Sequence, residues 1–137
     1  MRKTLDDLLC ERYPLIFAER NLSMQESCMY WGFACDDGWF TLIDTLCAKL
    51  QAHTDLNGAP QVVATQVKEK YGELRFYVQA ADKYQHGMIA FATAMSAQLC
   101  EKCGHPGKRF KRDGWLVTRC EKHASRESDS VDEPSQP

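Results

Sequence analysis

The stretch CEKCGHPGKRFKRDGWLVTRCEKH, residues 100–123, decides how the end of this chain folds. It begins and ends with a ligand pair, Cys100 with Cys103 and Cys120 with His123, and sixteen residues separate the pairs. A two-residue spacer lets both side chains of a pair turn onto one ion, and a hairpin of this length returns the chain to complete a tetrahedron. Four protein ligands close such a site, so the spacing predicts a structural rather than a catalytic Zn²⁺.

The residues between the pairs predict the hairpin itself. Asp113-Gly114 is a strong signal for a type I′ turn, and it joins Arg109–Arg112 to Trp115–Arg119. Gly104 follows the first pair, where the backbone after a knuckle often needs a positive φ. Knuckle, hairpin and a second pair that opens a short helix together make a treble-clef or zinc-ribbon layout.

Two alternatives for the metal ligands stay open. His105 lies two residues past Cys103 and competes with His123 as the fourth ligand, although the regular spacing favours His123. Cys28 and Cys35 are candidates for a second site, which no paired spacing supports.

Cysteine usage also predicts where the protein resides. The chain has seven cysteines, an odd count, and three of them are already predicted ligands. Asp6 and Asp7 interrupt the apolar run that a signal peptide would need. We therefore expect a reducing cytoplasm. Cys47 lies on an apolar helical face, and we expect it, and Cys10 similarly, in the core.

Three helices are expected upstream of the metal ligands. The first begins near Thr4, taken as its N-cap. The second follows Asp36-Asp37-Gly38, with either aspartate as its cap, and the third spans about 84–99. Apolar residues recur at helical spacing in the last two and predict their buried faces. These residues are Trp39, Leu42, Ile43, Leu46, Cys47 and Leu50 in one helix, and Met88, Phe91, Ala92, Met95 and Leu99 in the other.

A β-hairpin is expected between those two helices. Val63–Lys68 and Leu74–Gln79 each alternate in polarity, and Tyr71-Gly72-Glu73 supplies the turn. Lys68, Lys70, Arg75 and Tyr77 then share a polar sheet face. The predicted fold class is α+β, with helices packed on a β-hairpin over residues 1–99, a zinc-bound β-hairpin module over 100–123 and a disordered acidic tail over 124–137.

Charge is unevenly distributed along the chain. The formal net charge is −2, yet residues 100–123 hold seven Lys/Arg against three Asp/Glu, and residues 124–137 hold one against four. The basic character is therefore local to the zinc region. An acidic tail that follows it directly can fold back on it or compete with an acidic partner.

Three classes of function fit these features. The favoured one is a non-enzymatic protein that binds and modulates another protein, since aromatic and Arg residues are common interface anchors. The alternative is nucleic-acid binding by the basic hairpin, with phosphate contacts and aromatic stacking. A treble-clef nuclease-like enzyme is the third, but the chain lacks an Asp-His or His-His pair at a strand end. Candidate contact residues for a protein or nucleic acid are Lys108, Arg109, Lys111, Arg112, Trp115 and Arg119.

Three ordered segments resemble a known group of proteins. They are Asp37–Ile43, Gln66–Tyr77 and the two ligand pairs together with Gly104, Pro106, Gly107, Trp115 and Thr118. This combination resembles small, largely uncharacterised proteins of phages and prophages that carry a C-terminal zinc-finger module. The resemblance covers roughly residues 28–123 and brings no catalytic residues. It implies, by analogy, a phage-borne inhibitor of host machinery or defence in the host cytoplasm.

Overall fold

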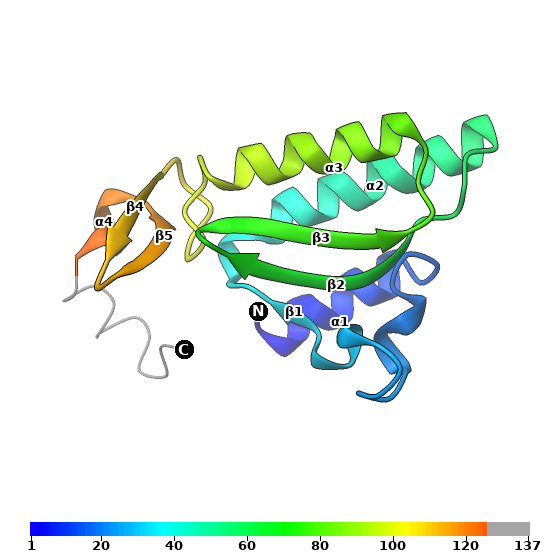
Figure 1. Cartoon of the computed structure of the whole chain (residues 1–137), viewed down its shortest axis with the longest axis horizontal. Coiled ribbons are helices and arrows are strands. Elements are labelled where there is room, and N and C mark those ends of the chain that lie inside the picture. The colour runs from blue at the N-terminus through cyan, green and yellow to red at the C-terminus, as the bar shows by residue number, and fades with distance from the viewer. Residues whose placement is uncertain (126–137) are drawn as a thin grey trace.

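The computed structural model describes residues 1–125 and has the predicted α+β architecture (Figure 1). Beyond Ser125, the tail expected from the sequence lies outside the described residues. No helix among the described residues is long and apolar enough to cross a membrane. The α-helices are α1 (Lys3–Arg12), α2 (Phe40–Asn57), α3 (Lys83–Ser96) and α4 (Glu121–Ala124). The strands are β1 (Phe33–Ala34), β2 (Val63–Lys70), β3 (Glu73–Gln79), β4 (Lys108–Arg112) and β5 (Trp115–Arg119).

The main sheet has the order β1-β2-β3, with β1 parallel to β2 and β2 antiparallel to β3. The predicted hairpin is confirmed, and Lys68 pairs with Arg75 on its polar face. Tyr71 and Gly72 both have positive φ, 57° and 78°, which is the type I′ geometry that matches strand twist. The parallel strand β1 was not expected from the sequence.

Strand β2 does not keep the simple alternation that its sequence suggests. A register irregularity lies between Ala64 and Gln66, so Ala64 and Val67 both face the core. A bulge inserts one extra residue and shifts every later side chain to the opposite face. The polar face of the sheet is nevertheless continuous from Lys68 onward.

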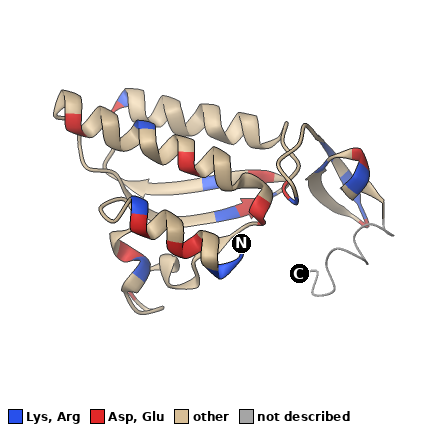
Figure 2. Ribbon diagram, turned by 180° about the vertical axis from the view of Figure 1, so that it is seen from behind, with Lys and Arg blue, Asp and Glu red and all other residues tan. Residues whose placement is uncertain are grey.

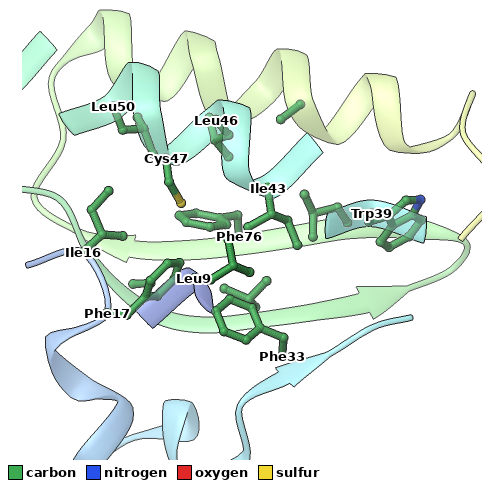
Figure 3. Packing of buried hydrophobic residues seen from close by; sticks show 14 of the residues in the cluster. Leu9, Ile16, Phe17, Phe33, Trp39, Ile43, Leu46, Cys47, Leu50 and Phe76 are labelled. Carbon is green, nitrogen blue, oxygen red and sulfur yellow. The ribbon is translucent and has the colours of Figure 1, made fainter. Parts of the chain in front are cut away.

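Helices α2 and α3 run side by side along one face of the sheet (Figure 1). The predicted face of α2 is confirmed, except that Leu42 is only half-buried. The predicted face of α3 is confirmed at Met88, Ala92 and Leu99, which pack on the core. Phe91 is the exception, because it is 69% exposed and Ile89 packs on the core instead. Phe91 and Ile89 both fit a helical spacing of apolar residues, so periodicity alone could not predict which of them is buried. Side chains from α1, α2 and the strands meet around Phe76 (Figure 3).

The helix starts differ from the predicted caps. Helix α1 has Arg2 rather than Thr4 as N-cap, and α2 has Trp39, without a side-chain cap bond at either. Asp37 does not cap α2, because its carboxylate accepts from the backbone N–H and Nε of Arg2. The capping box of this chain lies at α3, where Asp82 and Gln85 bond each other's backbone.

Residues 15–35, whose sequence suggests irregular structure with a short helix, form two short 3₁₀ turns and β1. The turns are η1 (Ala18–Asn21) and η2 (Cys28–Trp31), and a third turn, η3 (Asp37–Trp39), leads into α2. Arg20 ties η1 to α1 through its bond with Asp6, at 3.1 Å between Nε and Oδ1. This segment includes β1, which pairs with β2, and leads into residues 36–39, which contact the knuckle.

A two-stranded sheet, β4 with β5, follows the main domain (Figure 1). Its turn is Asp113-Gly114, with φ of 52° and 84°, as the type I′ signal predicted. The preceding knuckle packs on Gly38 so closely that a Cβ there would lie 2.2 Å from Cys100 O and 2.4 Å from Glu101 O. Because those atoms belong to the backbone, they cannot be displaced as easily as the end of a flexible side chain.

We therefore predict that Gly38→Ala separates the knuckle from the main domain. Overpacking against backbone should lower the free energy of unfolding by about 2–3 kcal/mol, measured by denaturant titration. Gly87→Ala is the matched control, because a Cβ at that α3 position meets nothing within 4 Å. It should stabilise the protein by about 0.5–1 kcal/mol. Equal stability of the two variants would contradict the tight contact.

Candidate metal centre

The four predicted ligands converge on one point. One ligand atom from each of Cys100, Cys103, Cys120 and His123 lies within 4.8 Å of every other. The Nδ1 atom of His123 is 3.6 Å from Cys100 Sγ and 3.3 Å from Cys120 Sγ. Cys103 Sγ and Cys120 Sγ are 3.7 Å apart. The four groups therefore form a candidate Cys₃His metal site, with Nδ1 as the histidine nitrogen that faces the sulfurs.

These separations fit a tetrahedron around one ion. Metal–sulfur bonds of about 2.3 Å at tetrahedral angles put two sulfurs about 3.8 Å apart, and a nitrogen ligand about 3.5 Å from a sulfur. The observed 3.7 Å between sulfurs and 3.3–3.6 Å from sulfur to nitrogen match both values. All four ligand atoms lie within 4.8 Å of one another, so one ion can lie among them.

Backbone hydrogen bonds shape both halves of the site. In the knuckle, Gly104 N–H donates to Cys100 O, and Cys100 N–H donates to His105 O. Gly104 has a φ of 80°, as expected for the residue after a knuckle. The first turn of α4 then brings His123 back over Cys120, with His123 N–H donating to Cys120 O at 3.1 Å.

The thiols differ in acidity. Burial acts to raise the pKa of Cys120, but hydrogen bonds from the His123 backbone and ring outweigh it and lower the pKa to about 7. Burial raises the pKa of Cys103 to about 11, although the backbone of His105 favours its thiolate. A metal binds thiolates and displaces their protons, so uptake should release protons at neutral pH.

The other candidate ligands lie outside this cluster. His105 places Nδ1 3.2 Å from Cys103 Sγ but is not one of the four converging groups. Cys28 is exposed and Cys35 is buried, and neither belongs to a group of three or more potential ligands among residues 1–125. Cys47 is fully buried in the core and Cys10 partly so.

Glu101, inside the knuckle, holds the metal module to the main domain. Its backbone O accepts from Gly38 N–H at 2.7 Å and its carboxylate accepts from Asp36 N–H at 2.9 Å. Its own N–H donates to Thr118 O on β5. Glu101 as a whole is 6% exposed, and burial raises the pKa of its carboxyl group to about 7.

Two more contacts complete this junction. The indole Nε1 of Trp39 donates to Leu99 O at 3.0 Å, just before the first ligand. On β5, Thr118 Oγ1 donates to Gly72 O at 2.6 Å, and this bond joins β5 to the β2–β3 turn. The module is thus held by two separate segments of the main domain, residues 36–39 and the β2–β3 turn.

The predicted contact residues of the hairpin divide into exposed and internal groups. Lys108, Arg109 and Lys111 are exposed, and Trp115 is 75% exposed. Arg119 is only 5% exposed and bonds Glu101, so it belongs to the junction and not to the outer face. Figure 2 shows Lys and Arg on the two-stranded sheet and α4. Half-buried Arg112 donates from Nη1 to His123 O at 3.4 Å.

A cleft of about 850 Å³ lies between β5 and the edge of the main sheet, and we call it the hairpin cleft. Sequence reasoning missed it, because its walls come from segments far apart in the chain. Its lining includes Met1, Tyr71, Glu101, Trp115, Val117 and Arg119. Tyr71 is 60% exposed, so two largely exposed aromatic side chains border one hollow.

Comparisons with known proteins add no identity. A scan against protein-family models, a search of curated proteins and a search of solved structures each returned no match.

We predict that Cys103→Ser loses the bound metal and unfolds residues 100–123, because three ligands cannot hold so small a module closed. Metal content per chain and backbone NMR signals of that region are the measurements. Cys28→Ser is the control, since Cys28 is also exposed but lies outside the cluster. Retained metal with intact secondary structure in Cys103→Ser would refute the site.

The two histidines are separated by a second pair of variants. His123→Asn should lose the metal, because its Nδ1 faces two sulfurs, whereas His105→Asn should keep it. Metal content after dialysis against a weak chelator gives the readout. If His105→Asn loses the metal and His123→Asn keeps it, then His105 is the fourth ligand in place of His123.

Proposed function

We propose that this protein is a non-enzymatic, zinc-stabilised module that binds another protein through the hairpin cleft. Zinc is the metal that best fits three thiolates and one imidazole in a closed tetrahedron. Four protein ligands leave no open position for a substrate or an activated water, which favours a structural role over catalysis.

Trp115 carries the proposal of a protein partner. A rigid hairpin presents its indole, 75% exposed, above a cleft whose opposite lip holds Tyr71, 60% exposed. Aromatic side chains that flank a pocket are the usual anchors of protein interfaces. Two exposed aromatic rings at one cleft favour a partner that covers them.

Nucleic-acid binding is the weaker alternative, because much of the basic charge is used internally. Arg109 pairs with Glu73 at 3.3 Å, Arg119 with Glu101 at 3.4 Å, and Lys102 with Asp36 at 3.4 Å. Each pair lowers the positive potential that would attract phosphates. The exposed lysines of the described module, Lys108, Lys111 and Lys122, make a smaller electrostatic footprint than the sequence count suggests.

The cellular setting is also a proposal. All seven cysteines are free of disulfides, which suits a reducing cytoplasm. The segments that resemble phage and prophage proteins favour a bacterial host protein as the partner, including one of the host's defence machinery. Capture of proteins from a bacterial lysate by a tagged chain tests the proposal of a bacterial partner.

The experiment compares capture by wild type with capture by Trp115→Ala and Tyr71→Asn, after nuclease treatment. Asn tolerates the left-handed backbone of Tyr71, at φ 57°, so the second variant removes only the ring. Each should capture at least about tenfold less partner, as expected for an interface anchor. Bound protein is identified and quantified by mass spectrometry.

Phe91→Ala is the matched control, because Phe91 is an equally exposed aromatic, at 69%, on α3 and outside the cleft lining. It should capture as much partner as wild type. Equal capture by all four chains would remove the cleft from the interface. Recovery that disappears with nuclease would instead support the nucleic-acid alternative.

A further inference from the structure

The floor of the hairpin cleft holds a buried guanidinium with unused hydrogen-bonding capacity. The side chain of Arg119 donates to two groups among residues 1–125, both from Nη1: to Glu101 Oε1 at 3.4 Å and to Thr118 O at 3.1 Å. Among the residues that the structure describes, Arg119 Nε is the one buried side-chain nitrogen or oxygen without a hydrogen-bond partner. A buried donor left unbonded is costly, so such a group calls for a ligand.

The carboxylates around it are already bonded. Glu69 accepts from Gly72 N–H at 2.7 Å, and Asp36 pairs with Lys102. Glu101 accepts from both Asp36 N–H and Arg119. What the floor lacks is therefore an acceptor, and the group best suited to a guanidinium edge is a planar carboxylate.

Position decides which kind of molecule can bring that acceptor. Trp115, Val117 and Arg119 alternate along β5, so their side chains lie on one face of the strand and all line the cleft. A ligand that reaches Arg119 consequently passes the exposed indole and the valine. A ligand with an acidic residue for Arg119 and an apolar neighbour for the indole and the valine matches these side chains.

We propose that Arg119 anchors a carboxylate-binding site in the hairpin cleft, and that the protein partner enters with an Asp or Glu side chain next to an apolar residue. The carboxylate accepts from the Nε edge of Arg119, while the apolar neighbour packs on Trp115. This inference rests on the proposed function and specifies the chemistry of the partner. It assigns Arg119 a binding role in addition to its bond with Glu101.

NMR of the zinc-loaded full chain tests the site directly through the Nε–H signal of Arg119, assigned by its absence in Arg119→Lys. The probes are the peptides acetyl-Leu-Glu-Leu-amide and acetyl-Leu-Gln-Leu-amide. The Glu peptide should shift this signal saturably, and the Gln peptide should bind about tenfold more weakly, because a charge-assisted hydrogen bond is lost.

Three outcomes of the titration would overturn the site. One is equal binding of the two peptides, and another is no saturable shift, which would leave an ordered water as the partner of Nε. The third is a stronger response to inorganic phosphate or to a single-stranded oligonucleotide, which would make the floor a phosphate site.

Capture from lysate separates this inference from the proposed function. Arg119→Lys keeps a positive charge beside Glu101 but lacks the Nε edge, and it should capture about tenfold less partner than wild type. Arg109→Lys is the matched control, as Arg109 lies on β4 outside the cleft lining. Metal content equal to that of wild type confirms that the variant is folded.

Unchanged capture by Arg119→Lys, together with loss in Trp115→Ala, would overturn the carboxylate site and leave the protein-binding role standing. Loss in neither variant would refute both. The peptide titration on wild type remains decisive if Arg119→Lys fails to fold.

Discussion

The whole arrangement depends on a backbone contact between Gly38 and the knuckle. Gly38 N–H donates to Glu101 O, and the space where a Cβ would lie is filled by the carbonyl oxygens of Cys100 and Glu101. The start of α2 and the first ligand pair are therefore fixed to each other at the closest distance that two backbones reach. Any shift of one element moves the metal ligands.

Metal site and main core support each other across this contact. A module of some two dozen residues cannot bury enough apolar surface to fold alone, and a structural zinc contributes on the order of 10–16 kcal/mol to such modules. The main domain supplies Trp39, fully buried, whose indole packs in the core and donates to Leu99 O beside the first ligand. Through that one side chain, core packing and ligand geometry are coupled.

Local signals in the sequence predicted local structure well. The ligand spacing and the Asp113-Gly114 turn specify the module because both act within a few residues. Interactions between distant segments escaped prediction: strand β1 forms only against β2, and Ile89 displaces Phe91 from the core only once α3 is docked. Asp37 likewise failed as a cap because Arg2, thirty-five residues earlier, takes its carboxylate.

The same distance effect governs how the basic hairpin should be interpreted. Counted along the sequence, its Lys and Arg residues suggest a surface for phosphates. A divalent ion held by three thiolates would carry a net negative charge. In the fold, the cations Lys102 and Arg119 lie beside the ligands, with side chains 8% and 5% exposed, paired to carboxylates. Part of the basic character therefore balances charge inside the module. Besides exposed basic side chains, the hairpin presents an aromatic ring at the rim of a cleft, and this ring is the feature on which the proposed protein interface rests.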